Sequence, residues 1–304
     1  MSPHCPGAQA GLTANANDPC PAPRRYWPVR RELFAPTLRY HFRFNPGKKM
    51  QIDWNSTLAA VWRQHRALLH PVTSVDPVRL DGLIGIDRQK HELVVNTERF
   101  LSGKPANNAL LWGARGTGKS SLIKAILNEY HSRGLRLIEI YRDDLRHMPE
   151  LVDDIRELPQ RFIVYTDDFS FEASENSYVA LKTILEGSIE RPPENILLYA
   201  TSNRRHLLPE HPTDNEGAEL VEGELHYSDA VEEKLSLSDR FGLWLSFYQP
   251  DLHGYLAIVD SYFPQYPGDR QALHEAARLF AMSRASRSGR TARQFYNAWS
   301  GQED

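Results

Sequence analysis

The glycine-rich segment Gly113-Ala-Arg-Gly-Thr-Gly-Lys119-Ser120 is the most informative part of this sequence. Phosphate oxygens need several backbone N–H groups converging on them, and glycines at 113, 116 and 118 leave room for that approach. We expect Lys119 to reach the outer phosphates and the Ser120 hydroxyl to ligate Mg²⁺. The loop follows a predicted strand over 108–112 and opens a predicted helix over 119–132, which is the context that this chemistry requires. The sequence therefore predicts a nucleoside triphosphate site, with ATP and Mg²⁺ as its ligands.

Strands and helices alternate on both sides of this loop. Apolar runs predict further strands, and periodic stretches between them predict helices over 149–158 and 178–190; the strands are expected at 135–141, 162–166, 196–200 and 243–247. Such alternation favours an α/β domain over 76–250, with a parallel sheet covered on both faces. Only helical patterns follow Pro250, at 252–263, 270–283 and 291–299. They predict a small helical lid over 251–304.

The segment before this domain is harder to interpret. Residues 1–25 are rich in Pro, Ala, Asn and Gly, and we predict a disordered leader there. Residues 26–75 are expected to form an extension with one strand near 40–44 and an amphipathic helix over 56–69 that begins after Ser56. Arginines and aromatic residues mix over 24–45, a pattern that favours packing but also suits contact with nucleic acid.

Composition sets the broad class of the protein. The chain has 304 residues and a formal net charge of -3, which gives no global signature of nucleic-acid binding. No stretch approaches the ~20 apolar residues of a membrane-spanning helix, and the beginning of the chain lacks the apolar run of a secretory signal. We therefore expect a cytoplasmic protein. Cys5 and Cys20 have no His or Cys partners at ligand spacing, so the sequence predicts no zinc site.

A pair of carboxylates follows the strand expected at 162–166. Asp167 is predicted to hold Mg²⁺, together with Ser120, and Asp168 to polarise the water that attacks the phosphate. The alternative is a pair of turn or helix-capping aspartates. Because aspartate is shorter than the glutamate that many hydrolases of this kind carry at the second position, Glu172 is a reserve candidate for the base.

Polar residues at three later positions extend the candidate site. Asn203 follows the strand over 196–200, where a side chain can orient water and contact the outermost phosphate. Arg240 precedes the strand over 243–247, and Arg290 and Arg293 open the last helix. A guanidinium group stabilises the charge of a transferring phosphoryl group through paired hydrogen bonds.

In this order, the motifs resemble the AAA+ ATPase superfamily. The resemblance covers roughly 76–304 and makes 113–120 the Walker A loop, 162–168 Walker B, Asn203 sensor 1 and Arg240 the arginine finger. Sensor 2 is Arg290 or Arg293, of which we prefer Arg293. The resemblance also assigns nucleotide contacts to the residues Ile84, Gly85, Ala114, Arg115, Thr117 and Ser121.

The resemblance implies a five-stranded sheet of order 5-1-4-3-2, with nucleotide bound between sheet and lid. It also implies a homo-oligomer, because an arginine finger acts on the ATP of a neighbouring subunit. More closely, the stretches 112–121, 200–207 and 289–295 resemble a bacterial AAA+-like group of unknown function, which identifies no substrate.

Three functions fit these expectations. The first is an ATP hydrolase that remodels or loads an unknown protein or nucleic-acid partner, and the second is a non-hydrolysing switch or scaffold that changes shape with ATP. The third, a small-molecule kinase, lacks an evident motif for an acceptor. The acidic stretch over 209–233 is either a solvated surface insertion or a partner-binding element.

Overall fold

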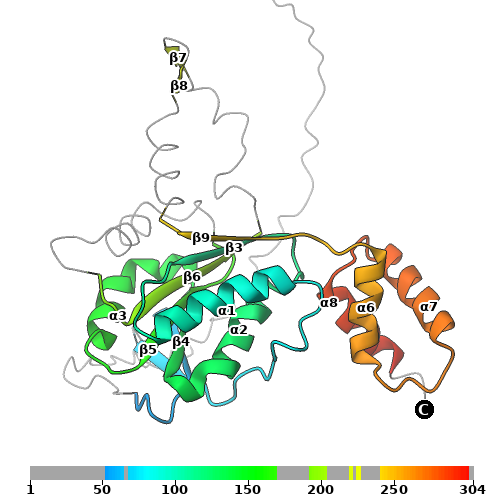
Figure 1. Cartoon of the computed structure of the whole chain (residues 1–304), viewed down its shortest axis with the longest axis horizontal. Helices are drawn as coiled ribbons and strands as arrows, with labels where there is room; N and C mark the ends of the chain where they lie inside the picture. Colours follow the sequence, from blue (N-terminus) through cyan, green and yellow to red (C-terminus); the bar gives the residue numbers. More distant parts are fainter. Residues whose placement is uncertain are drawn as a thin grey trace, which may run out of the picture. The chain divides into compact units, whose positions relative to one another are not determined.

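The computed structural model describes residues 52–64, 68–169, 192–203, 219–221, 224–226 and 240–300. These residues form a seven-stranded sheet with helices on both faces, followed in the chain by three further helices (Figure 1). The predicted leader, the Arg/aromatic segment over 24–45 and the helix over 178–190 lie outside the described residues. Cys5, Cys20 and Glu172 lie outside them as well.

All five predicted strands of the core are present, and their order is confirmed. The sheet runs in the order β2-β1-β4-β5-β6-β3-β9. The core strands are β3 (Ala109–Gly113), β4 (Leu135–Glu139), β5 (Arg161–Thr166), β6 (Ile196–Ser202) and β9 (Leu243–Phe247). They pair in parallel throughout. Numbered along the chain, these five strands lie in the expected order 5-1-4-3-2, and two more strands extend the sheet beyond β4.

The prediction of a helix over 56–69 is wrong. This segment forms β1 (Ala59–Arg63), which pairs in parallel with β4, and β2 (Leu68–Pro71), which pairs antiparallel with β1. Ser56 caps no helix, and its hydroxyl donates to Asp53 Oδ2 at 2.7 Å. The misleading feature is a short apolar run buried on both faces of a sheet, which periodicity alone cannot distinguish from a buried helix. Pro71 is tolerated because β2 is an edge strand of the sheet.

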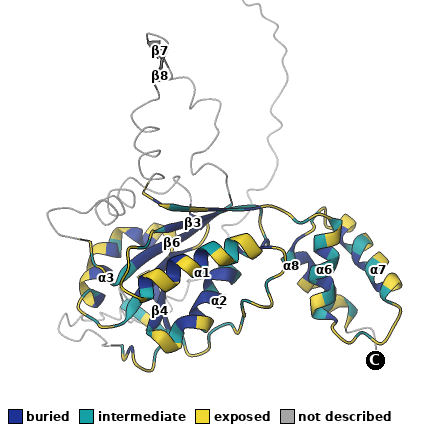
Figure 2. Cartoon of the chain, viewed as in Figure 1, coloured by how far each residue is buried: buried dark blue, intermediate teal, exposed yellow. Residues whose placement is uncertain are grey.

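Helices cover the two faces of the sheet (Figure 2). On one face, α1 (Asp87–Leu101) and α2 (Lys119–Tyr130) bury Leu93 and Leu122 against strand residues such as Leu111. On the other face, α3 (Met148–Ile155) buries Leu151 against Val164. Helix α1 is an addition to the predicted set, whereas α2 and α3 lie where the sequence predicts helices. The functional consequence is that α2 begins directly at the glycine loop.

The region predicted to be a lid contains the three predicted helices α6 (Leu252–Tyr262), α7 (Arg270–Ser283) and α8 (Gly289–Trp299). Each helix has a side chain that caps its amino end, provided by Asp251, Asp269 and Ser288 respectively. Together the helices bury a core of their own, which includes Tyr255, Phe263, Leu273, Ala277 and Phe295.

Two short strands lie within the acidic stretch over 209–233. The backbone of β7 (Glu219–Val221) pairs antiparallel with that of β8 (Glu224–His226), so the stretch contains a hairpin that the sequence analysis did not predict. The other residues of the stretch lie outside the described part of the chain. Among the helices that the structure describes, none has both the length and the apolar character needed to cross a membrane.

Candidate functional site

The glycine loop connects the carboxyl end of β3 to the amino end of α2. Gly113, Gly116 and Gly118 have φ values of 128°, 75° and 99°, in the region that side-chain-bearing residues rarely adopt. A Cβ atom on Gly113 would lie 2.0 Å from the Phe247 carbonyl oxygen, so no other residue fits there without moving β9. The backbone path of this loop therefore requires the glycines that the sequence provides.

Three contacts hold the loop in place. The Ala114 N–H donates to the Phe247 carbonyl at 3.0 Å, and the Thr117 hydroxyl donates to the Ala114 carbonyl at 2.8 Å. A Cβ atom on Gly118 would meet the Ile86 side chain at 3.5 Å, so the residue just before α1 packs against the loop. The backbone N–H groups at the start of α2 have no partners within the helix, which makes this end a favourable place for phosphate.

Lys119 is the cation of the loop, and it is 6% exposed. Its Nζ donates to the carbonyls of Gly113 and Ala114 at 2.8 and 2.7 Å and to Asn203 Oδ1 at 3.1 Å. Burial lowers the pKa of Lys119 to about 8, although the nearby carboxylates of Asp167 and Asp168 act in the opposite direction. The lysine is thus held against the glycine loop and beside the two aspartates.

The two predicted metal ligands lie side by side. The Ser120 hydroxyl donates to Asp167 Oδ1 at 2.9 Å, and the Thr201 hydroxyl donates to the same oxygen. Burial disfavours the charged carboxylate, but the hydrogen bonds from surrounding hydroxyl groups outweigh burial and hold the pKa of Asp167 below its usual value. A hydroxyl and an ionised carboxylate are hard oxygen donors of the kind that Mg²⁺ prefers, so these residues fit the ion.

Asp168 and Asn203 meet beside the loop. Asp168 has a φ of 51°, which is unusual for a residue with a side chain and is a form of strain often found at functional sites. Its carboxylate accepts a hydrogen bond of 2.6 Å from the Asn203 amide, and its backbone N–H donates to the Thr201 hydroxyl at 3.2 Å. Because Asn203 also accepts from Lys119, one amide group links the loop lysine to the candidate base.

The lid contacts the loop through the amino end of α8. The Arg290 N–H donates to the Gly116 carbonyl at 3.4 Å, and a Cβ atom on Gly116 would lie 2.9 Å from Ser288 Oγ. The positive charge of Arg290 helps to lower the pKa of Lys119, after the larger effects of burial and the two carboxylates. Arg293 is exposed one turn further along α8. Of the two candidate arginines, Arg290 is the one that the structure brings to the loop.

Arg240 lies outside the strands, on the side of their amino ends, whereas the glycine loop lies on the side of their carboxyl ends. It precedes β9, whose first residue Leu243 pairs with Ala109 and whose last residue Phe247 pairs with Gly113. At a rise of ~3.3 Å per residue, Leu243 and Phe247 lie ~13 Å apart along β9, so this strand separates the end that follows Arg240 from the end that pairs with the glycine loop. The contacts described above thus bring Lys119, Ser120, Asp167, Asp168 and Asn203 together, with the backbone of Arg290 at the loop.

The remaining predicted contacts surround the loop. Gly85 has a φ of 77°, and Ile84 is 37% exposed in the turn before α1. Arg115 is exposed at the tip of the loop, and Ser121 is half-buried in the first turn of α2. These positions are compatible with the predicted nucleotide contacts.

Thr201 is a site residue that the sequence analysis missed. It lies two residues before Asn203, so both side chains project from the same face of the chain at the tip of β6. The sequence signal that could have identified Thr201 is a hydroxyl residue two positions before Asn203, on a strand next to the one that ends in two aspartates.

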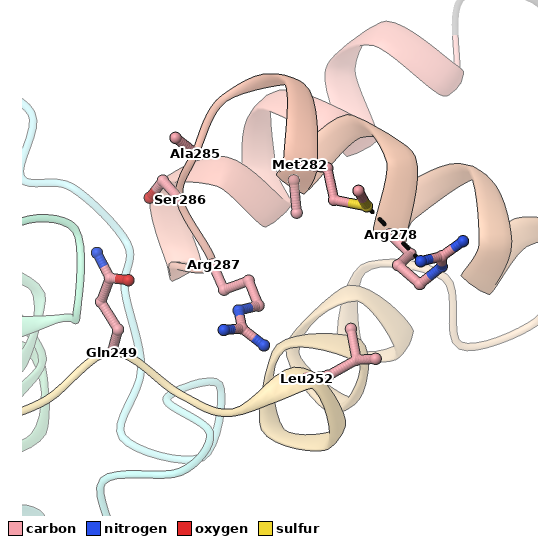
Figure 3. Close-up of a pocket in the computed structure, with 8 residues that line it drawn as sticks. Gln249, Leu252, Arg278, Met282, Ala285, Ser286 and Arg287 are labelled. Carbon is pink, nitrogen blue, oxygen red and sulfur yellow. Dashed lines mark hydrogen bonds between the residues drawn. The ribbon is translucent and has the colours of Figure 1, made fainter.

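A cavity of about 440 Å³ lies elsewhere, between the segment after β9 and the end of α7. Gln249, Leu252, Met282 and Arg287 are among the residues that line it (Figure 3). None of the predicted site residues lines this cavity, so we do not assign it to the nucleotide.

The strand order and the position of the loop define an AAA+-type P-loop protein. More specifically, the chain belongs to the family described as "Protein of unknown function (DUF815)", whose model matches residues 55–303.

Two curated relatives match part of the chain. The replication factor C large subunit of Ignicoccus hospitalis is 36% identical over 77 residues, which cover 25% of this chain and 16% of that protein. The corresponding protein of Staphylothermus marinus is 34% identical over 76 residues, covering 25% and 17%. The matched region is thus a small part of these relatives.

Among solved structures, the chain is similar to the Thermotoga maritima RuvB Holliday junction branch migration motor, with 13% identity and a TM-score of 0.42. The match covers 74% of this chain and 72% of that one. A single-residue variant of that protein matches with 14% identity, the same TM-score of 0.42 and the same coverage, 74% and 72%. We draw no functional conclusion from similarity at this level.

Proposed function

We propose that this chain is an ATP hydrolase that binds ATP with Mg²⁺ at the loop 113–120. The observation that carries the proposal is the contact between the Ser120 hydroxyl and Asp167 at 2.9 Å, at the end of the glycine loop. It joins the two oxygen donors that a nucleotide-bound magnesium needs, on residues that come from two different elements of the fold. When bound, Mg²⁺ would neutralise charge that develops on the phosphates.

The residues around this pair have distinct roles in the proposal. Lys119 binds the outer phosphates, Asp168 orients and polarises the attacking water, and Asn203 holds Asp168 in place through its 2.6 Å hydrogen bond. Arg290 extends from the lid toward the phosphates, since its backbone already contacts Gly116. We keep Arg293 as a second lid contact, as the sequence predicts.

We further propose that hydrolysis takes place between subunits of a cytoplasmic homo-oligomer. The support is the position of Arg240, which precedes the amino end of β9, whereas the loop of its own chain follows the carboxyl end of β3. From there it is suited to the site of a neighbouring copy, where a guanidinium group would stabilise the transferring phosphoryl group. The cycle would remodel or load a macromolecular partner, whose identity is open.

Mixing two inactive variants tests this arrangement. Lys119→Ala removes the phosphate contact, and Arg240→Ala removes the arginine, so phosphate release by each variant alone should fall at least about tenfold. If Arg240 acts on a neighbour, an equimolar mixture regains activity, because some interfaces combine an intact Lys119 with an intact Arg240. A mixture as inactive as its components would contradict hydrolysis between subunits, and a wild-type chain that releases no phosphate would contradict the hydrolase.

A non-hydrolysing switch is the second candidate, and the geometry of Asp168 favours it. The side chain of Asp168 is short, and one carboxylate oxygen accepts a hydrogen bond from Asn203. A carboxylate that is short and already hydrogen-bonded to Asn203 would activate water poorly, so ATP could bind without rapid hydrolysis. Micromolar ATP binding without phosphate release, in the presence of Mg²⁺ and at high protein concentration, would establish the switch.

A further inference from the structure

Tyr165 carries a buried hydroxyl group that the proposed roles do not use. It lies on β5, two residues before Asp167, so the two side chains project from the same face of the sheet. Tyr165 is 3% exposed, and its hydroxyl oxygen has no hydrogen-bond partner among the described residues. Buried polar groups without partners are rare, and each one costs free energy, so this one calls for an explanation.

The surroundings of this hydroxyl are those of the candidate metal site. The side chains of Asp167, Ser120 and Thr201 surround it, and Glu139 is its register neighbour on β4. A tyrosine hydroxyl carries a proton that it can donate to an acceptor such as a carboxylate oxygen.

A second tyrosine shows that the fold can satisfy such a group. Tyr199 is the register neighbour of Tyr165 on β6, and it is fully buried. Its hydroxyl pairs with Asn96 Nδ2 at 3.1 Å and with Thr97 Oγ1 at 2.9 Å. The two residues share the same type, sheet face and row, so the unpaired state of Tyr165 is specific to its place beside Asp167.

We propose that Tyr165 is a positioning residue of the magnesium site, whose hydroxyl donates to the Asp167 carboxylate when nucleotide and metal are bound. The inference deepens the proposed function and rests on it. In the structure, Asp167 Oδ1 accepts hydrogen bonds from both Ser120 and Thr201. A carboxylate can accept several hydrogen bonds, so the Tyr165 hydroxyl can add a further one that holds Asp167 charged and in place beside the ion.

The test compares Tyr165→Phe with Tyr199→Phe in the full-length chain. ATP affinity is measured by calorimetry in EDTA and in saturating Mg²⁺, and the unfolding temperature is measured without ligand. In Tyr165→Phe we expect unchanged affinity in EDTA, affinity in Mg²⁺ weaker by about tenfold, and an unfolding temperature that is equal or higher. Tyr199→Phe should show the reverse, a lower unfolding temperature with the effect of Mg²⁺ intact.

The outcomes separate the inference from the proposed function. Equal Mg²⁺ effects in Tyr165→Phe and wild type would overturn the inference, as would equal losses in both variants, since these indicate a general disturbance of the sheet. A lower unfolding temperature in Tyr165→Phe without a change in the Mg²⁺ effect would also overturn it. If the wild-type chain itself binds no ATP, or binds it equally with and without Mg²⁺, the proposed nucleotide site fails instead.

Discussion

The perturbed charge of Lys119 leads to a prediction about pH. Burial lowers the pKa of this lysine from 10.5 to about 8. Phosphate oxygens next to the amine would favour its charged form and raise the pKa again, so ATP binding takes up a proton above about pH 8. At about pH 9, roughly one free chain in ten has the lysine charged, and the affinity for ATP should therefore fall about tenfold from about pH 7.

The stability of the chain without nucleotide should change in the opposite direction. Because the folded pKa is depressed, the unfolded chain binds more protons between about pH 8 and pH 10.5, and stability contributed by this group rises across that window. A difference between 10.5 and about 8 corresponds to about 3 kcal/mol over the whole range. Affinity and stability thus have opposite pH slopes, which general alkaline damage to the fold would not produce.

Calorimetry can measure the proton directly. ATP titrations at about pH 9, in buffers of different ionisation enthalpy, should reveal uptake of close to one proton per site. Lys119→Arg is the matched control, because a guanidinium group stays charged and removes the pH dependence even if it binds less tightly. Affinity that does not change between about pH 7 and about pH 9, without any buffer dependence, would refute the assignment of Lys119 to the phosphates.

Three further predictions concern the loop, the candidate base and the added strands. Gly116→Ala places a Cβ 2.9 Å from Ser288 Oγ at a φ of 75°, so ATP affinity should fall about tenfold in calorimetry. Gly134→Ala is its control, with a φ of 89° and open space around the new Cβ, and should lose only stability. Asp168→Asn should keep ATP binding but reduce phosphate release at least about a hundredfold. A pull-down with this variant in ATP should then capture the partner. Full turnover by the variant would show that Asp168 is not the base. Trp62→Ala on β1 should cost about 3–5 kcal/mol in urea unfolding, and a loss below about 1 kcal/mol would mean that β1 is not part of the core.

The sequence predicted the core of the fold because each core element carries a strong local signal. The five parallel strands are apolar runs bounded by turns and helices, and α6, α7 and α8 have clear periodicity with side-chain caps. The segment over 59–71 lacks such a signal. Ala-Ala-Val-Trp is buried because distant parts of the chain cover both faces of β1, with Ala60 and Trp62 in one core cluster and Ala59 in the other, and such packing is invisible in a local pattern.

In the candidate site, too, residues within a local motif could be predicted, whereas residues placed by tertiary packing could not. Lys119, Ser120 and Asp167 could be predicted because their roles follow from the loop and from the strand before the aspartates. The sequence alone could not decide between Arg290 and Arg293. Which of the two lies near the loop depends on where α8 begins relative to the loop. Ser288 caps α8 and lies against Gly116, which brings the first turn of the helix, and with it Arg290, to the glycine loop.

Thr201 shows why the site works as a unit rather than as a set of motifs. Its hydroxyl donates to Asp167 and accepts from the Asp168 N–H, so one residue of β6 fixes both aspartates of β5. Asn203, two residues further, joins Asp168 to Lys119. A displacement of Lys119 toward a phosphate would therefore act on Asp168 through Asn203, while Thr201 keeps Asp167 aligned with Ser120. The tip of β6 thus connects the loop lysine to the candidate base, and the residues that do so are recognised only when neighbouring strands are considered together.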